Sequence, residues 1–182
     1  MSSPRRAPAH VTLVRHAGAI RCSLDPMSTS SDPSTPLTAR AHGSALRGRG
    51  WLNTGGAELD LEALRGKIVL LDFWTFCCVN CLHVLDELRP LEEKWAQELV
   101  VIGVHSPKFE FEKDPEALAA NIERYEVSHP VIDDPELETW TEYGARAWPT
   151  LMVLDTHGRI AGNLSGEGHA ANLDRLVEQL VA

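Results

Sequence analysis

Two runs of apolar and β-branched residues mark the centre of the predicted fold. They cover residues 67–74 and 99–104, and Asp72 is the polar exception well inside the first run. Continuous apolar runs of strand length are typical of strands that are buried on both faces. We therefore predict two central strands of a sheet that helices cover on both sides.

Helical periodicity appears between and after these runs. From residue 78 to residue 95, leucines recur at helical spacing, and Pro90 is expected to bend this helix. Pro115 lies in the first turn of the next predicted helix, where its missing N–H costs nothing. The helices predicted after the first one cover residues 115–125, 135–143 and 170–181.

The remaining pattern adds short strands and turns. A strand is predicted at residues 129–132, and a helical or turn segment at residues 59–64. A hairpin follows, with strands at residues 150–154 and 160–164 on either side of a glycine-containing turn. This order predicts an α/β fold, a three-layer sandwich with a mixed central β-sheet. Several α/β folds share that pattern, and the cysteines decide among them.

The first 50 residues differ in composition from the rest of the 182-residue chain. They are rich in Ser, Pro, Arg and Ala, and their seven arginines are balanced only by Asp25 and Asp32. Such a segment buries little apolar surface to offset the entropy of ordering. We predict a disordered basic tail over residues 1–50 and a folded, acidic domain over residues 51–182.

One motif in the tail points elsewhere. Residues 11–16 (VTLVRH) resemble the first strand and the phosphate-binding Arg-His of histidine phosphatases. Those enzymes need a full α/β domain after that strand, whereas a Ser/Pro-rich stretch follows here. We therefore set this interpretation aside.

Charge and hydropathy exclude two classes of partner. The net charge of −9 argues against a general nucleic-acid binder, which needs a cationic face. No apolar run reaches the roughly 18 residues that a transmembrane helix needs, so no membrane partner is expected. The apolar stretch at residues 11–20 is interrupted by Arg15 and His16 and makes a poor secretory signal. We expect a cytoplasmic protein, and the sequence predicts no oligomeric state.

Three of the four cysteines are clustered, at Cys77, Cys78 and Cys81. Clustered cysteines more often bind metal or perform redox chemistry than staple a secreted scaffold. A Cys-x-x-Cys pair at the start of a helix places its first sulfur where free N–H groups and the helix dipole stabilise a thiolate. Only the thiolate attacks a disulfide. Cys78 is the predicted nucleophile, and Cys81, one turn later, is the predicted resolving thiol.

The residues around this pair resemble a known family. The run from Asp72 to Cys81 (DFWTFCCVNC) and the later Ala-Trp148-Pro149-Thr resemble the active-site junction and the cis-proline loop of thioredoxins and TlpA-type proteins. Together with residues 101–106 and 166–169, they are most similar to the thioredoxin-like domain of NHL-repeat-containing proteins. The resemblance spans residues 50–182 and implies a thioredoxin-like fold.

The resemblance also implies roles. Pro149 is expected to be cis and to pack against the thiols, and the backbone of Trp148 to pair with an extended substrate. Asp72, beneath the cysteines, is expected to exchange a proton with Cys81, helped by a pKa that burial raises. Cys77 replaces the tryptophan of thioredoxins and is assigned to substrate binding. Because a Val-Asn dipeptide separates the cysteines, the redox direction is not predicted.

Other interpretations stay open at this stage. The cysteines with His83 have the donor types of a zinc site, although zinc sites usually join two separated pairs. Buried structural thiols are a second alternative. His105, His129 and His169 are interpreted as structural or surface groups, and Glu167 with His169 as the edge of the site by resemblance. The acidic loop that contains Glu110, Glu112 and Asp114 is interpreted as a solvated surface.

The sequence therefore predicts a thiol–disulfide oxidoreductase with a redox-active Cys78/Cys81 pair. Its partners are expected to be protein or small-molecule thiols and disulfides, with a role in cell redox homeostasis. No metal or other cofactor is expected, since the electrons come from another dithiol. The alternative is a thioredoxin-fold binding or scaffold module whose redox activity is incidental.

Overall fold

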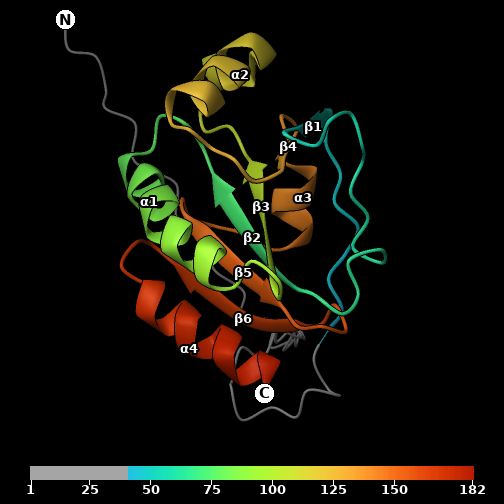
Figure 1. The fold of residues 1–182 in the computed structure, drawn as a ribbon. Coiled ribbons are helices and arrows are strands. Elements are labelled where there is room, and N and C mark those ends of the chain that lie inside the picture. The colour runs from blue at the N-terminus through green and yellow to red at the C-terminus, as the bar shows by residue number, and fades with distance from the viewer. Residues whose placement is uncertain (1–40) are drawn as a thin grey trace, which may run out of the picture.

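The computed structural model describes residues 41–182, which form a six-stranded mixed sheet between helices (Figure 1). The strand order is β1-β4-β3-β2-β5-β6. β2, β3 and β4 run parallel, whereas β1, β5 and β6 pair antiparallel to their neighbours. The strands are β1 (Gly50–Leu52), β2 (Ile68–Trp74), β3 (Leu99–His105), β4 (Val131–Asp133), β5 (Thr150–Leu154) and β6 (Ile160–Ser165). The α/β fold with a mixed central sheet is as the sequence predicts.

The helices cover the two faces unequally. They are α1 (Val79–Lys94), α2 (Pro115–Arg124), α3 (Glu138–Glu142) and α4 (Ala170–Val181), with a 3₁₀ turn, η2, at Glu110–Lys113. Figure 1 shows α1 and α4 on one side of the sheet and α3 on the other. The three layers follow from this arrangement.

The central strand β2 is buried along its whole length, and its two faces pack against different cores. Ile68 and Leu70 lie in the core shared with α1 and α4. Phe73 lies in the opposite core, where its ring contacts Trp140 of α3 at 6.1 Å between centroids. Burial of each such side chain stabilises the fold by about 1.5–3 kcal/mol. β2 is therefore a rigid platform for the residues at its C-terminal end.

Local capping sets where the helices begin. The carboxylate of Asp114 accepts the N–H of Glu116 at the start of α2, and Pro115 occupies its first position. Asp134 caps α3 by accepting the N–H groups of Glu138 and Trp140. Cys78 caps α1, as described below. The predicted starts of all these helices agree with the structure within three residues.

The prediction of a tail that extends to residue 50 is wrong for its last ten residues. Ala41 and Gly43 exchange backbone hydrogen bonds with Ile160 and Gly158 around the β5–β6 hairpin. Further along, the Arg49 side chain binds the carboxylate of Asp133 at 2.6 Å. The folded part therefore begins before residue 51, and the predicted tail over residues 1–40, which contains the phosphatase-like motif and Cys22, lies outside the described residues.

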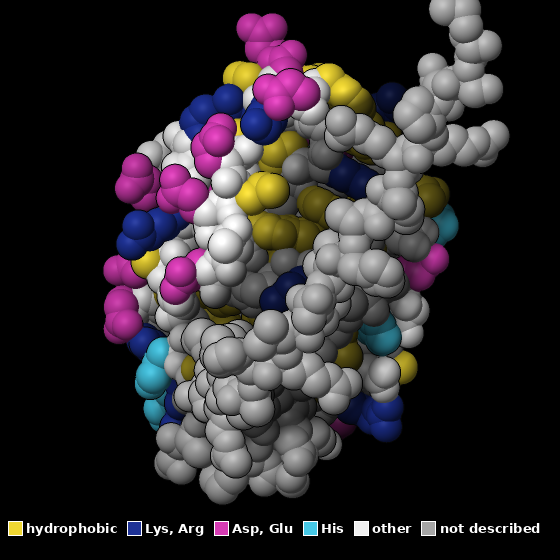
Figure 2. Space-filling view, turned by 180° about the vertical axis from the view of Figure 1, so that it is seen from behind, with side chains coloured by type: hydrophobic (Ala, Val, Ile, Leu, Met, Phe, Trp, Pro, Cys, Tyr) yellow, Lys and Arg dark blue, Asp and Glu magenta, His cyan; other side chains and the backbone are white. Residues whose placement is uncertain are grey.

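Two elements were not predicted. β1 has three residues, too few to show a periodicity, and it forms because it pairs with β4. The second is η2, whose Glu112 is fully buried, so the interpretation of that acidic loop as a solvated surface is wrong for this residue. Seen from behind in Figure 2, other acidic side chains lie mainly along one edge and the top of the face, and hydrophobic side chains show in its centre.

Candidate active site

Cys78 occupies the N-cap of α1, at the C-terminal end of β2. Its backbone is extended, with φ −96° and ψ 108°, and its Sγ accepts the N–H of Cys81 at 3.4 Å. The Cys78 backbone N–H is bound by the carbonyl of Thr75, which turns the chain from the strand into the helix. The sulfur is partly exposed. A sulfur anion here is stabilised by the helix dipole and by a peptide N–H.

Cys81 lies one turn further along α1 and is fully buried. Its side chain packs in a cluster with Trp74, Phe76 and Leu85, and Cys78 lies against the same cluster. Burial, followed by a hydrogen bond with the Cys78 side chain, raises the pKa of the Cys81 thiol. The two cysteines therefore differ: Cys78 is partly exposed at the helix end, whereas Cys81 is buried and its thiol is hard to ionise.

Asp72 is a buried carboxyl group on the strand beneath the cysteines. It is fully buried on β2, and neither of its carboxyl oxygens has a hydrogen-bond partner among residues 41–182. Burial raises the pKa of Asp72 to about 7, although the charge of His129 opposes the shift. Asp72 also acts electrostatically on Cys81, whose pKa it helps to raise. This carboxyl group can change its charge near neutral pH.

A second buried carboxylate holds the chain segment that leads to Cys78. Glu112 of η2 accepts hydrogen bonds from the Thr75 hydroxyl and from the N–H groups of Cys77, Lys108 and Phe109. Burial alone would raise the pKa of Glu112, but these hydrogen bonds outweigh it and lower the pKa. The lowered pKa favours the carboxylate form of Glu112, and its four hydrogen bonds fix the loop before the dithiol.

Cys77, next to the nucleophile, is exposed. Its backbone N–H donates to Glu112 at 3.3 Å. Loss of solvent around its sulfur, followed by the Glu112 carboxylate, raises the pKa of the Cys77 thiol. The exposed Cys77 thiol is therefore less easily ionised than an ordinary cysteine thiol.

The loop before β5 completes the site. The Trp148–Pro149 peptide bond is cis. The Trp148 indole stacks on Trp140 at 4.2 Å, and its Nε1–H donates to the carbonyl of Ser106 at 2.8 Å. Trp148 also packs against the cluster that contains Cys81. The sequence-predicted residues at positions 72, 77, 78, 81, 148 and 149 thus come from three segments that meet at the C-terminal ends of β2 and β3.

The glycine-rich loop between β6 and α4 lies against α1. Glu87 of α1 accepts the N–H groups of Gly168 and His169, and His83 binds the Glu167 carboxylate at 2.5 Å. These contacts hold residues 166–169 within one or two helical turns of the dithiol. The loop is therefore attached to the helix that carries both cysteines.

Comparison with known proteins decides the family. The family model described as thioredoxin-like matches residues 66–160, more than half of the chain. The chain belongs to the thioredoxin-like family.

Several curated proteins resemble this thioredoxin-like chain. The chloroplastic protein SUPPRESSOR OF QUENCHING 1 of Arabidopsis thaliana is 44% identical over 128 residues, which cover 70% of the chain and 12% of that protein. The NHL repeat-containing protein 2 of Gallus gallus is 43% identical over 125 residues, 68% of the chain and 17% of that protein. The thiol-disulfide oxidoreductase ResA of Geobacillus thermodenitrificans is 29% identical over 135 residues, 72% of the chain and 74% of that protein. The first two relatives are therefore far longer than this chain.

The fold has close counterparts among solved structures. The thioredoxin-like superfamily protein SPOA0173 superimposes with a TM-score of 0.73 at 21% identity, covering 78% of this chain and 97% of that one. At this identity the likeness concerns the fold alone. It agrees with the predicted thioredoxin-like architecture.

The described part of this thioredoxin-like domain has neither a cluster of metal ligands nor a bilayer-spanning helix. Within residues 41–182, no three His, Cys, Asp or Glu side chains come together as a metal site would require. The cysteines and His83 thus form no such group there. Over the same residues, no helix has both the length and the apolar character to cross a bilayer.

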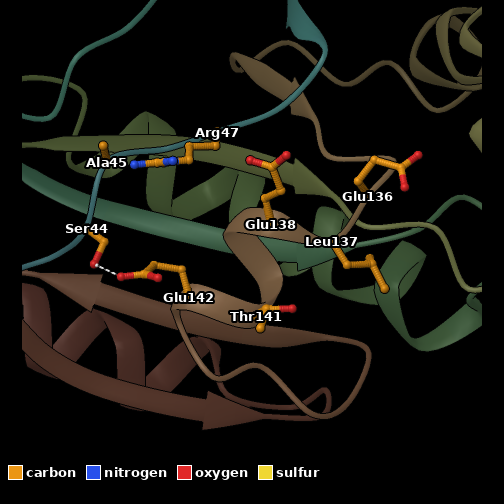
Figure 3. A pocket seen from close by; sticks show the side chains of 8 residues that line it. All are labelled: Ser44, Ala45, Arg47, Glu136, Leu137, Glu138, Thr141 and Glu142. Carbon is orange, nitrogen blue, oxygen red and sulfur yellow. Dashed lines mark hydrogen bonds between the residues drawn. The ribbon is translucent and has the colours of Figure 1, made fainter.

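A polar hollow of about 450 Å³ lies elsewhere on the molecule. Figure 3 shows the segment around Ser44 and Arg47 on one side of it and α3 with the residues before it on the other. The Ser44 hydroxyl donates to Glu142 at 2.8 Å across the opening. None of its lining residues belongs to the dithiol site.

Sequence reasoning missed three residues near the site. Glu112 was interpreted as part of a solvated surface, and His129 was interpreted as structural or surface-exposed. Glu92 received no interpretation, although it lies 11 residues after Cys81, three helical turns along the same face. The helical spacing was the available signal for Glu92. The burial of His129 and Glu112 depends on tertiary contacts, which the sequence pattern does not carry.

Proposed function

We propose that this domain is a thiol–disulfide oxidoreductase whose Cys78 attacks a disulfide and whose Cys81 resolves the mixed disulfide. One observation carries the proposal: the Cys78 sulfur caps α1 and accepts the N–H of Cys81, with the Cys81 thiol directly behind it. A helix terminus stabilises negative charge, and a thiolate is the attacking species.

The proposed reaction transfers two electrons from the protein dithiol to the substrate disulfide. The Cys78 thiolate attacks one sulfur of the substrate disulfide, and the other sulfur leaves as a thiolate that takes a proton from water. Cys81 then loses its proton and attacks Cys78, so that the second substrate sulfur leaves. The protein dithiol is oxidised to a disulfide, and the substrate disulfide is reduced to two thiols. The reverse sequence oxidises a dithiol substrate.

Asp72 is proposed as the proton acceptor of Cys81. Three features support this role: its position beneath the pair, its electrostatic effect on Cys81, and a pKa raised to about 7 by burial. A base is most effective when its pKa lies near the working pH. The ResA relative, whose name is that of a thiol-disulfide oxidoreductase, supports the same reaction class.

A polypeptide is the proposed substrate class. Three large apolar side chains near the dithiol are exposed: Val79 between the cysteines at 61%, Phe109 at 51% and Phe111 at 59%. Phe111 contacts Phe76, and the Lys108 ammonium lies 5.7 Å from the rings of both Phe109 and Trp148. An apolar rim of this kind suits a protein partner. Its segment next to the disulfide would pair with the backbone at Trp148 and Pro149 and pass over Cys77.

The experiment is a redox titration of the purified chain in glutathione buffers, combined with turnover of a protein disulfide. We expect a single two-electron transition that maps to Cys78 and Cys81, and loss of turnover in Cys78→Ser. A Cys78→Ser protein as active as the wild type would contradict the proposal and favour a binding module. Phe109→Ser with Phe111→Ser is expected to raise KM for the protein disulfide while leaving the reaction with oxidised glutathione unchanged.

A cytoplasmic location is part of the proposal and rests on the clustered cysteines and the tail composition. The relative SUPPRESSOR OF QUENCHING 1 is named as chloroplastic, and that name describes the location of the relative alone. Fractionation of cells that express the chain with its native N-terminus tests the location. Recovery in any other compartment contradicts it.

A further inference from the structure

Next to Asp72, the side chains of Trp74, Val131 and His129 pack closely over Gly103 of β3. Asp72 and Gly103 are register partners on parallel strands, so their side-chain positions lie on the same face of the sheet, toward α1. A Cβ atom on Gly103 would lie 3.0 Å from Trp74 Nε1 and 3.3 Å from His129 Nε2. Gly103 thus leaves room in which the indole and imidazole nitrogens approach the strand position next to Asp72.

The polar atoms around Gly103 lack hydrogen-bond partners among residues 41–182. Within residues 41–182, both carboxyl oxygens of Asp72, Nε1 of Trp74 and Nε2 of His129 make no hydrogen bond to other protein atoms. An unpaired buried polar atom costs about 1–3 kcal/mol. Asp72 and His129 are the titratable members of this set, and the charge of His129 acts on Asp72.

The Nδ1 side of the His129 imidazole faces Glu92, which is nearer the surface. His129 Nδ1 lies 3.0 Å from Glu92 Oε1 on α1. The His129 side chain is 6% exposed, whereas the Glu92 side chain is 24% exposed. The carboxylate therefore reaches solvent while the imidazole does not. Solvent exposure thus rises in the order Asp72, His129, Glu92, from the buried end of the site to the surface.

We propose that His129, held by Glu92, passes the proton between Asp72 and solvent during the resolving step. This inference rests on the proposed function, because it concerns the proton that Cys81 releases. His129 and Glu92 touch no reacting sulfur and are positioning residues that act through Asp72.

In the proposed step the proton passes from Cys81 to solvent through three side chains. Asp72 takes the proton of Cys81 as the Cys81 sulfur attacks Cys78. The Asp72 proton then moves to Nε2 of His129, while the proton on Nδ1 passes to Glu92 and from there to water. Asp72 returns to its carboxylate form, and the imidazole resets by exchanging its tautomer. One proton leaves the protein for each resolved mixed disulfide.

Other buried groups near the site do not offer such a path. Glu112 is saturated by hydrogen-bond donors. His105 stacks on Phe76, and its Nδ1 lies 3.6 Å from Asp133, on the β4 side of the sheet. The titratable groups that act on Asp72 are Glu92 and Cys81 from α1 and His129 from the segment before β4. β3 and β5 contribute Gly103 and Leu151, which do not titrate.

The test follows the two chemical steps separately in the full chain. Reduced protein is mixed with oxidised glutathione, quenched with acid at millisecond intervals, and the Cys78–glutathione adduct is quantified by peptide mass mapping. The variants are His129→Gln and Glu92→Gln, which keep a hydrogen-bonding amide but cannot relay a proton. Glu93→Gln is the matched control, because it removes the same charge from an exposed neighbouring position on α1.

We expect adduct formation within about twofold of the wild type in every variant. Adduct decay is expected to slow about tenfold in His129→Gln and in Glu92→Gln, less than the 10²–10⁴-fold typical of a direct general base. Because the Glu92 carboxylate raises the pKa of Asp72 and His129 lowers it, the pH of half-maximal decay should move down in Glu92→Gln and up in His129→Gln. A purely structural role does not produce opposite displacements.

Unchanged decay in both variants, or equal slowing by Glu93→Gln, overturns the inference. If His129→Gln does not fold, Glu92→Gln decides alone, since its side chain reaches the surface. A wild-type protein that forms no adduct at Cys78 contradicts the proposed function itself, and this result is distinct from normal adduct formation with unaltered decay.

Discussion

Two buried carboxyl groups flank the dithiol, and their surroundings shift their pKa values in opposite directions. Glu112, beside the loop before Cys78, accepts four hydrogen bonds, and its pKa is lowered. Asp72, beneath Cys81, has no hydrogen-bond partner within residues 41–182, and burial raises its pKa to about 7. Both side chains are closed to solvent, yet the pKa is lowered in one carboxyl group and raised in the other. Hydrogen bonding decides which carboxyl group anchors the loop and which can carry a proton.

The largest expected effect is on chemistry at Asp72. Asp72→Asn removes the base and no hydrogen bond within the described residues, so the rate of mixed-disulfide resolution should fall by about 10²–10⁴-fold with the fold retained. Rapid-quench kinetics with oxidised glutathione measures the rate, and thermal unfolding checks the fold. Resolution within threefold of the wild type would assign the proton to another acceptor.

The next effect is on stability at Glu112. Glu112→Ala leaves the Thr75 hydroxyl and three peptide N–H groups without their acceptor, which should lower the free energy of unfolding by about 3–5 kcal/mol. Urea denaturation of the reduced protein measures it. The control is Glu110→Ala in the same 3₁₀ turn, whose carboxylate is exposed and should change stability by less than about 0.5 kcal/mol. Equal effects of both substitutions would remove the contrast between the two carboxyl groups.

The two groups also predict opposite dependences on pH. With a folded pKa of about 7 against an ordinary 3.8, Asp72 binds its proton more tightly in the folded state. Its contribution to stability is present below pH 4 and is lost as the pH rises through 7, about 2–3 kcal/mol of it between pH 5 and 8. Glu112, with a pKa lowered from 4.5, loses its contribution as the pH falls from its ordinary pKa through its folded pKa, so it adds no slope in this range. Unfolding of wild type and Asp72→Asn at both pH values isolates the Asp72 part, and parallel slopes would contradict it.

The smallest effect concerns the hydroxyl that binds Glu112. Thr75→Val keeps the shape of this fully buried side chain but removes one of the four donors to Glu112. We expect a loss of about 1–2 kcal/mol in unfolding free energy and an upward shift of the Glu112 pKa. Denaturation and carboxyl titration by NMR check both. A stability equal to the wild type would show that the peptide N–H groups alone hold the loop.

Much of the fold was predictable because local patterns carry it. The predicted positions of β2, β3, β5 and α4 agree with the structure within one residue. A strand buried on both faces is a continuous apolar run, and a helix with one apolar stripe has apolar residues at helical spacing. Both patterns can be recognised in consecutive residues. β1 and the segment before it were not predictable, because they are ordered by Asp133 and the β5–β6 hairpin, far away in sequence. Pairing between distant segments leaves no periodic signal.

The candidate site divides in the same way. The spacing of Cys78 and Cys81 and the position of Asp72 at the end of a buried strand are local features, and the structure brings them together. The groups that set the two carboxyl groups apart lie far from them in sequence. The donors to Glu112 come from residues 75–77 and 108–109, and His129, which acts on Asp72, comes from the segment before β4. In sequence, Glu112 resembles its solvated neighbours, and only the fold distinguishes it.

The most direct test of the account is the identity of the attacking sulfur. Reduced Cys81→Ser protein is incubated with oxidised glutathione, and the trapped mixed disulfide is located by peptide mass mapping. We expect one persistent adduct, on Cys78, formed faster than any modification of the exposed Cys77. An adduct that forms first on Cys77, or no adduct on Cys78, would contradict a nucleophile held at the start of α1.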